Sequence, residues 1–197
     1  MKILLASGNP HKKEELNKIL FNHTLILPSE LGIEMDVEET GVTYQENAML
    51  KAEALFKLSD GMPVLADDSG ISVDALNGAP GVYSARYGLK ELGKELSSEE
   101  KNLFLLKNLE GVKDRKAAFI CCMALILDKN RVFTIQESFE GVISQEPYGK
   151  GGFGYDPVFY LPNLCKTAAE LSDDEKNKIS HRGRAGFTLK KLLEIYD

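Results

Sequence analysis

The sequence lacks an excess of basic residues, a cysteine framework and any long apolar run. Its 24 lysines and arginines are outnumbered by 30 aspartates and glutamates, which gives a formal net charge of −6. Binding to a nucleic acid polymer requires a basic surface, so this balance argues against DNA or RNA as a partner. A small anionic ligand is still compatible, because it needs only a few lysines and backbone N–H groups.

The three cysteines, Cys121, Cys122 and Cys165, form neither a disulfide framework nor a zinc-binding pattern. The apolar run after Met1-Lys2 is four residues long, 3–6, which is too short for a signal-peptide core or a membrane span. We therefore expect a cytoplasmic protein with no membrane association. The 197 residues contain no repeat, low-complexity stretch or proline-rich linker, so we expect a single domain, residues 1–197.

Apolar runs rich in β-branched residues alternate with helical patterns, which predicts an α/β fold. The predicted strands are 3–6, 33–38, 63–66, 117–127 and 132–139. The predicted helices are 10–21, 43–59, 97–109, a short helix after Ser172 and a C-terminal helix ending near Tyr196. Because the two long strands are neighbours joined by the turn 128–130, we expect an antiparallel pair and hence a mixed sheet.

The first segment that could carry chemistry is Ser7-Gly8-Asn9-Pro10-His11-Lys12, which lies between a predicted strand and a predicted helix. A helix start presents unpaired N–H groups and the positive end of the helix dipole, so a phosphate can bind there. The segment lacks the second glycine and the Gly-Lys-Ser/Thr ending of a Walker A loop. From these residues alone, an ordinary capped turn and a phosphate site are equally compatible.

Acidic residues form a second set. Asp67 and Asp68 directly follow a predicted apolar strand, and neighbouring residues of an extended chain point in opposite directions, so one of the two should face the site. Glu38 ends the predicted strand 33–38, and Glu39 is next to it. One aspartate and one glutamate from separate segments suit Mg²⁺, which takes one or two carboxylates together with waters and phosphate oxygens.

Three further groups of polar residues are candidates. Asn47 and Lys51 are four residues apart on a predicted helix and share a face that could reach phosphates. The segment 149–157 contains G-x-G-x-x-G, but a strand-like segment follows it instead of a helix, which excludes a dinucleotide fingerprint. Its Phe153 could instead support a flat base. Lys176 and the segment 180–184, interpreted as a loop between helices, offer donors that could contact a base edge.

Taken together, these segments resemble the inosine triphosphate pyrophosphatase family, which removes non-standard purine nucleoside triphosphates. The matching stretches, which follow the family's order along nearly the whole chain, are SGNPHK at 7–12, EETG at 38–41, ENAMLKA at 46–52, LADDSGISVDALNGAPGVYSARY at 65–87, GKGGFGYDPVF at 149–159, KTAAEL at 166–171 and EKNKISHRGRA at 175–185.

The resemblance implies an elongated mixed β-sheet with two α/β lobes, a nucleotide cleft between the lobes, and a homodimer. It also implies residue roles. Asp68 resembles the general base, and Glu38 with Asp68 resembles the pair that binds Mg²⁺. The matched phosphate-binding positions are Ser7, Gly8, Asn9, Pro10, His11, Lys12 and Lys51, and Ser69 matches a substrate contact. The matched sugar and base contacts are Phe153, Gly154, Tyr155, Asp156, Lys176, His181 and Arg182.

The function that follows is Mg²⁺-dependent hydrolysis of ITP, dITP or XTP to the monophosphate and pyrophosphate. In this hypothesis Asp68, or its neighbour Asp67, deprotonates a water for attack at the α-phosphorus, and Lys12 and Lys51 bind the β- and γ-phosphates. Donors near His181 would favour a 6-keto purine and explain rejection of ATP, but not of GTP. A related pyrophosphatase for other modified nucleotides and a non-catalytic nucleotide sensor are the alternatives.

Overall fold

A computed structural model, which describes residues 1–196, confirms a mixed α/β fold. The strands are β1 (Lys2–Ala6), β2 (Thr24–Ile26), β3 (Val64–Val73), β4 (Lys116–Asp128), β5 (Arg131–Ile143), β6 (Phe159–Leu161) and β7 (Lys166–Thr167). The α-helices are α1 (Pro10–Ile19), α2 (Tyr44–Phe56), α3 (Leu89–Leu92), α4 (Ser98–Asn108), α5 (Asp173–Ile179) and α6 (His181–Leu193). Within residues 1–196, no helix is long and apolar enough to cross a membrane.

The strands form one sheet with the order β2-β1-β3-β4-β5-β6-β7. Strand β1 pairs in parallel with β2 and with β3, whereas β6 pairs antiparallel with β5 and with β7. The sheet is therefore mixed, as the sequence predicted. Strands β4 and β5 are neighbours joined by the two residues 129–130, and both are longer than predicted.

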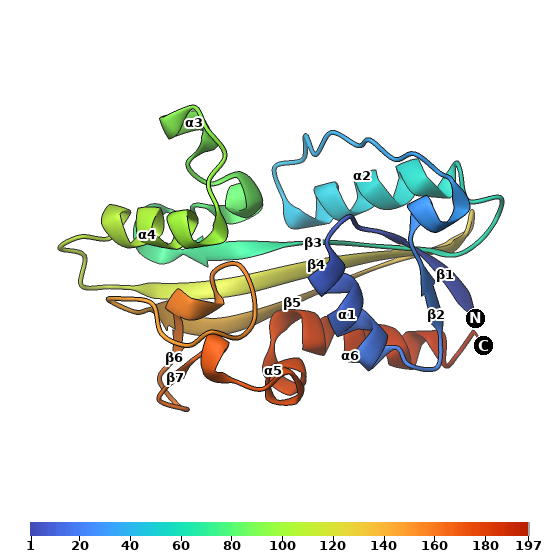
Figure 1. Ribbon diagram of the computed structural model, residues 1–197. Helices are drawn as coiled ribbons and strands as arrows, with labels where there is room; N and C mark the ends of the chain where they lie inside the picture. Colours follow the sequence, from blue (N-terminus) through green and yellow to red (C-terminus); the bar gives the residue numbers. More distant parts are fainter. Residues whose placement is uncertain (197) are drawn as a thin grey trace. The chain divides into compact units, whose positions relative to one another are not determined.

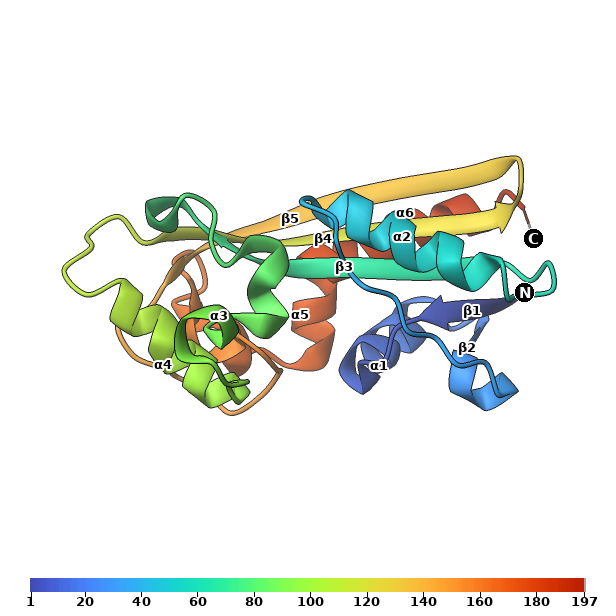
Figure 2. The same cartoon turned by 90° about the horizontal axis from the view of Figure 1, so that it is seen from above.

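The chain divides into two compact units. Unit 1 comprises residues 1–69, 121–137 and 181–197, and unit 2 comprises residues 70–120 and 138–180. In unit 1, α1 and α6 cover one face of the strands and α2 covers the other (Figures 1 and 2). Leucine and isoleucine side chains of β1, α1 and α6, together with residues of β4, form the core beneath α1 and α6.

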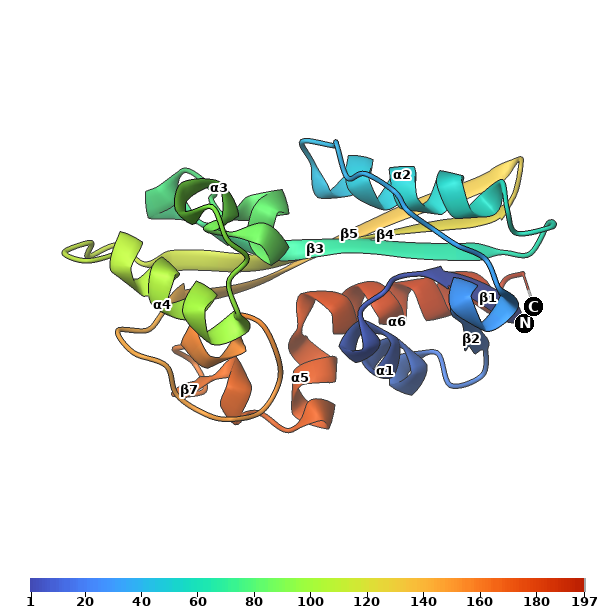
Figure 3. The same ribbon diagram turned by 45° about the horizontal axis from the view of Figure 1, so that its top comes forward.

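Unit 2 has its own core, built from the remaining halves of the long strands together with α4 and β6. Leu105 and Leu109 of α4 pack in this core with Phe119, Phe139 and Phe159, whose rings contact one another. The segment between β5 and β6 contains the glycine-rich residues 149–154. This segment (orange) runs beside α4 in Figure 3, and Asn102 of α4 is hydrogen-bonded to it.

Three helix starts follow the predicted capping chemistry. Thr43, Ser97 and Ser172 each cap a helix, and the glutamate three residues later returns a hydrogen bond to the cap residue. The start of α1 is also as predicted, because the side chain of Asn9 accepts a hydrogen bond from the N–H of His11, and Pro10 occupies the first helical position. These local signals depend on residues a few positions apart, so the sequence contains them in full.

The predicted strand at 33–38 was wrong. These residues are extended, and their side chains alternate between half-buried and exposed, but the segment belongs to none of the strands of the sheet. The alternating pattern reports which side chains point inward, whereas a strand also needs a hydrogen-bonded neighbour. Strand β2, which is the actual neighbour of β1, is three residues long and was not predicted.

The interpretation of residues 180–184 as a loop was also wrong, since α6 begins at His181. Gly183 and Gly186 made the segment look like a poor helix. The structure gives a packing reason for Gly186, because a Cβ atom there would lie 3.1 Å from the side chain of Ile19. The glycine thus lets α6 approach α1 closely (Figure 3). His181 and Arg182 lie in the first turn of α6.

Candidate functional site

Strand β3 presents its two adjacent aspartates to opposite faces of the sheet. Its side chains alternate, so Asp67 lies on the same face as Leu65, beneath α1 and α6, and Asp68 lies on the face covered by α2. Both follow Ala66, the last residue of β3 that pairs with β1. The prediction that only one aspartate can face a given site is therefore confirmed, and each carboxylate has its own set of partners.

Asp67 is the centre of a buried network on the α1 and α6 side. Its Oδ2 atom lies 3.1 Å from Nζ of Lys12 and 3.1 Å from Nη2 of Arg182. Arg182 also donates to Oε2 of Glu15 at 2.8 Å and to Oγ of Ser69 at 2.7 Å. The network joins α1, β3 and α6, and two of its members in direct contact, Glu15 and Arg182, are 167 residues apart in the chain.

Electrostatics favour the charged forms within this network. Burial opposes ionisation of Asp67, but Lys12, Arg182 and Lys51 outweigh it, so the pKa of this carboxyl lies well below its usual value. The pKa of Arg182 is raised in turn, since Asp67 and Glu15 overcome the effect of burial. The Cys121 thiol, 4.0 Å from Asp67, has a pKa raised to about 12 by burial and by that carboxylate, so it stays a thiol.

Asp68 lies in a different group of polar side chains on the α2 side. Its Oδ1 atom accepts a hydrogen bond from Nζ of Lys51 at 3.2 Å, and its Oδ2 atom accepts one from Nδ2 of Asn47 at 3.3 Å. Lys51 also donates to Oε1 of Glu39 at 2.7 Å. The Oδ1 atom of Asn47 accepts from the N–H of Gly41, which fixes the segment that carries Glu39.

The charge balance at Asp68 is the reverse of that at Asp67. Burial raises the pKa of Asp68, and the nearby Glu39 raises it further, against the opposing effects of Lys51 and Lys12. The pKa of Lys51 is raised, because its three carboxylate neighbours outweigh burial. A buried carboxyl that holds a proton more readily than usual is suited to accept one during a reaction.

The turn before α1 has the geometry expected of an anion-binding helix start. Ser7 accepts a hydrogen bond from the N–H of Asn9 at 3.2 Å, and Asn9 caps α1. Nothing lies within 4 Å of the position where Gly8 would carry a Cβ atom, so its backbone is open to approach. Lys12 occupies the first turn of α1, where its ammonium group contacts Asp67.

In unit 2, some of the predicted base-binding residues form a second group, whereas Arg182 lies in the Asp67 network of unit 1. The Oδ2 atom of Asp156 accepts from the N–H of Phe153 at 2.8 Å and lies 2.6 Å from Nζ of Lys176. The Lys176 ammonium also lies 4.6 Å from the centroid of the Phe153 ring, a cation–π contact. Tyr155 donates from its hydroxyl to the carbonyl of Ser84 at 2.8 Å. The structure thus gathers Phe153, Asp156 and Lys176.

Glu39, and not Glu38, shares Lys51 with Asp68, because alternation along the extended segment turns the neighbouring Glu38 side chain outward and leaves it exposed. His181 is 5 % exposed at the start of α6. Sequence reasoning missed Glu15, which lies one helical turn after Lys12 but carries no motif of its own. Its partner Arg182 is distant in sequence, so no local signal identifies the pair.

The donor set around Asp68 fits Mg²⁺ bound together with phosphate. Within residues 1–196, no three His, Cys, Asp or Glu side chains gather as a preformed metal site. Mg²⁺ is often held by one or two carboxylates and completed by substrate phosphates and water, so it does not require such a cage. Asp68 and Glu39 already share one cation, the Lys51 ammonium, and this shows that the two carboxylates converge.

Buried carboxylates and lysines lie next to a helix start, where the parallel strands β1 and β3 separate. This arrangement is typical of α/β proteins that bind small ligands at the carboxyl ends of parallel strands. The chain belongs to the Ham1 family, whose model matches residues 3–194. The match covers both units and all the residues described above.

Relatives and solved structures agree with this assignment. A Treponema denticola protein named dITP/XTP pyrophosphatase is 54 % identical over 194 residues, which cover 98 % of this chain and 99 % of the relative. A Staphylococcus epidermidis protein of the same name is 48 % identical, with 98 % and 96 % covered. The Ham1 protein of Staphylococcus aureus, a solved structure, has a TM-score of 0.89 and 42 % identity, with both chains fully covered. The predicted resemblance is confirmed.

Proposed function

We propose that this protein hydrolyses non-standard purine nucleoside triphosphates, dITP, XTP and ITP, to the monophosphate and pyrophosphate, with Mg²⁺ as cofactor. The relatives named dITP/XTP pyrophosphatase support the substrate class. The observation that carries the chemistry is Asp68, a buried carboxylate with a raised pKa between Lys51 and Asn47.

In this proposal Asp68 is the general base. Its carboxylate accepts a proton from a water molecule that attacks the α-phosphorus, and the raised pKa makes the proton transfer more favourable. Asn47 and Lys51 hold the two carboxylate oxygens and so set their orientation. The bond between the α-phosphorus and the bridging oxygen breaks, and pyrophosphate leaves with the electron pair.

The phosphate end of the substrate binds to unit 1. The Ser7–Lys12 turn offers backbone N–H groups at the start of α1, and Lys12 and Lys51 provide positive charge. Mg²⁺ would be held by Asp68 together with the Glu38–Glu39 pair, and it would supply neutralisation of the charge that develops on the leaving pyrophosphate. Ser69, fixed by Arg182, contributes a hydroxyl group on the same strand as Asp68.

The base stacks on the Phe153 ring beside the Lys176 ammonium, which is held by Asp156. Gly154 and Tyr155 complete this loop as backbone and hydroxyl contacts. A donor from the His181–Arg182 region favours a 6-keto group over the 6-amino group of adenine, because a 6-amino group would face a donor. The Arg182 guanidinium itself is bound to Asp67, Glu15 and Ser69, so it holds this region in place. We further propose that the protein is a cytoplasmic homodimer, and light scattering during gel filtration tests the oligomeric state.

The deciding experiment is a panel of triphosphates: dITP, XTP, ITP, dATP, dGTP and dUTP, each with Mg²⁺ and each with EDTA. Pyrophosphate and orthophosphate are measured separately. We expect pyrophosphate as the first product, from dITP, XTP and ITP in preference to dATP, and no turnover in EDTA. Orthophosphate as the first product, or a preference for dATP, would contradict the proposal. Preference for dUTP would favour a pyrophosphatase for other nucleotides.

A nucleotide sensor is distinguished by the same panel combined with calorimetry. A sensor would bind dITP with Mg²⁺ and release no pyrophosphate. In that case neither the wild type nor the Asp68→Asn variant would release pyrophosphate. An enzyme instead loses turnover in this variant while it retains measurable dITP binding.

A further inference from the structure

A small number of hydrogen bonds hold the loop that carries Phe153 in place. Gly152 and Gly154 both have positive φ angles, +68° and +63°, so the peptides on either side of Phe153 have backbone freedom that other residues lack. A side chain at Gly152 would run into the carboxylate of Asp156, so this glycine is required. The loop therefore needs specific hydrogen bonds to hold Phe153 in one position.

Asp156 fastens the loop on one side of Phe153, through the Phe153 N–H at 2.8 Å. On the other side, Nδ2 of Asn102 donates to the carbonyl oxygen of Gly154 at 3.1 Å. Asn102 lies on α4 and is 3 % exposed. Its amide therefore acts on the peptide that directly follows Phe153, from a helix that is itself anchored in the core of this unit through Leu105 and Leu109.

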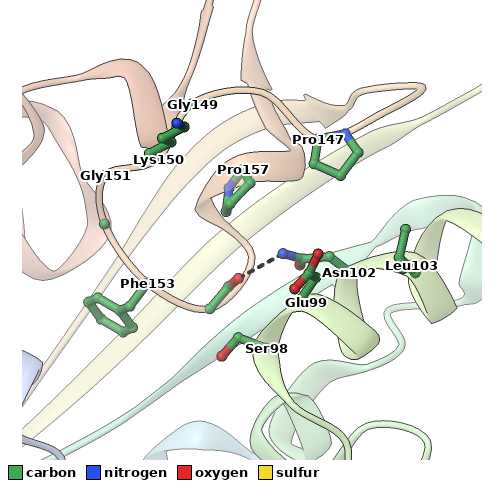
Figure 4. A pocket seen from close by; sticks show the side chains of 12 residues that line it. Ser98, Glu99, Asn102, Leu103, Pro147, Gly149, Lys150, Gly151, Phe153 and Pro157 are labelled. Carbon is green, nitrogen blue, oxygen red and sulfur yellow. Dashed lines mark hydrogen bonds between the residues drawn. The ribbon is translucent and has the colours of Figure 1, made fainter.

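A cavity of about 470 Å³ lies between α4 and the loop, lined by Asn102, Ser98 and Leu103 on the helix side and by residues 149–154 on the loop side. Figure 4 shows the Asn102–Gly154 hydrogen bond beside this cavity. At this cavity the hydrogen bond joins the loop to α4.

The oxygen atom of the Asn102 side-chain amide has an unusual environment. This Oδ1 atom is buried, and no group of residues 1–196 forms a hydrogen bond with it. A buried acceptor without a partner destabilises the fold, so an apolar side chain of the same shape would serve stability at least as well. The benefit of asparagine at this position must therefore come from its donated hydrogen bond to Gly154.

We propose that Asn102 is a positioning residue for base binding, which acts through the Gly154 carbonyl to hold the Phe153 ring in the orientation that stacks on the purine. This inference rests on the proposed function. Such positioning serves the ground state and the transition state equally, so its loss raises KM and leaves kcat unchanged. A residue that served only the fold would instead lower the active fraction, and KM would stay constant.

The test compares Asn102→Leu with Asn108→Leu. Asn108 is a matched control, because it lies on the same helix and donates an amide hydrogen bond to Tyr87 at 2.8 Å, away from the loop. We expect Asn102→Leu to keep the wild-type melting temperature or exceed it, and its KM for dITP to rise roughly five- to tenfold, the lower end of the range that loss of one aromatic–base stack produces. Asn108→Leu should leave KM unchanged. An Asn102→Leu variant with unchanged KM overturns the proposal.

A double-mutant cycle tests whether Asn102 acts through Phe153. In a Phe153→Ala background there is no ring to position, so Asn102→Leu should raise KM no further. Additive effects of the two changes overturn the proposed route. If Asn102→Leu fails to fold, Asn102→Ala takes its place in the same cycle.

Calorimetry with dIMP separates this inference from the proposed function. If the wild type releases no pyrophosphate from dITP but binds dIMP, the catalytic proposal fails, and weaker dIMP binding by Asn102→Leu still supports the role of Asn102. Unchanged dIMP binding in this variant overturns that role. If the wild type binds no dIMP, the role of Asn102 in base binding fails, whereas the catalytic proposal is decided by pyrophosphate release from dITP alone.

Discussion

The Nη2 atom of Arg182 lies 3.1 Å from Oδ2 of Asp67, and the side chains of both residues are at most 2 % exposed. This ion pair joins α6 to the centre of β3 and is buried in the core of unit 1. A buried pair of this kind stabilises the fold little more than apolar residues would, but removal of one partner leaves an uncompensated charge.

We therefore expect Arg182→Met to destabilise the protein by about 3–5 kcal/mol, because Asp67 would lose its guanidinium partner. The free energy of unfolding in urea, measured at neutral pH, gives this value. The double variant Asp67→Asn with Arg182→Met is the control, since it removes both charges. If the single and double variants prove equally unstable, the loss does not arise from an uncompensated Asp67.

The stability of the protein should decrease below about pH 4 in a way that depends on Asp67. The pKa of Asp67 is lowered in the folded protein from its ordinary value of 3.8, so the unfolded chain takes up the proton first as the pH falls. The stability from this group is thus complete above 3.8 and is lost as the pH falls towards the folded pKa. The free energy of unfolding in urea, measured at several pH values between 3 and 6, should depend more steeply on pH for the wild type than for Asp67→Asn. Parallel curves would contradict the assignment.

Ionisation of Asp68 should have the opposite effect on the stability of the protein. The folded pKa of Asp68 is raised above 3.8, so the folded protein takes up the proton first, and the charged form costs stability as the pH rises through the folded pKa. Asp68→Asn should therefore be more stable than the wild type at neutral pH in EDTA. A gain of about 1 kcal/mol would raise Tm by roughly 2–4 °C.

The same Asp68→Asn variant should lose activity, because an amide cannot accept the proton from water. We expect kcat for dITP to fall by about 10²–10⁴-fold, the usual contribution of a general base. A variant that is both more stable and much less active would match a carboxylate placed for chemistry at a cost to stability. A kcat within tenfold of the wild type would remove Asp68 from the role of base.

The variants Glu38→Gln and Glu39→Gln form a matched pair that identifies the metal ligand. Both changes remove one carboxylate from adjacent positions, but Glu39 alone shares Lys51 with Asp68. The variant that loses a ligand should need roughly tenfold more Mg²⁺ for half-maximal activity, and the other should match the wild type. Equal behaviour of the two variants would show that neither carboxylate binds the metal on its own.

Local chemistry made much of the fold predictable. The capping residues Thr43, Ser97 and Ser172 and the turn between β4 and β5 are encoded by neighbours in sequence, and the structure confirms them. The predicted strand at 33–38 failed, because alternation of side chains does not specify a pairing partner. The start of α6 at His181 was missed, because the need for Gly186 comes from Ile19, a residue of another helix.

The candidate site divides in the same way. Residues such as Asp68, Lys51 and Phe153 belong to short motifs, and the sequence indicated them through these motifs. Glu15 and Asn102 carry no motif, and their importance comes from partners in distant parts of the chain, Arg182 and Gly154. Such roles depend on the tertiary fold, so they cannot be derived from one sequence.

The alternation of β3 has a consequence for how this site can evolve. Asp67 and Asp68 have the same chemistry, and only the parity of their position in the strand makes one a structural ion-pair partner and the other a reactive carboxylate. Insertion or deletion of a single residue between Val64 and Asp67 would exchange the two faces and turn every following side chain over. Changes of length here are thus far less tolerable than changes of residue, because the number of residues in the strand decides which face of the sheet each aspartate is on.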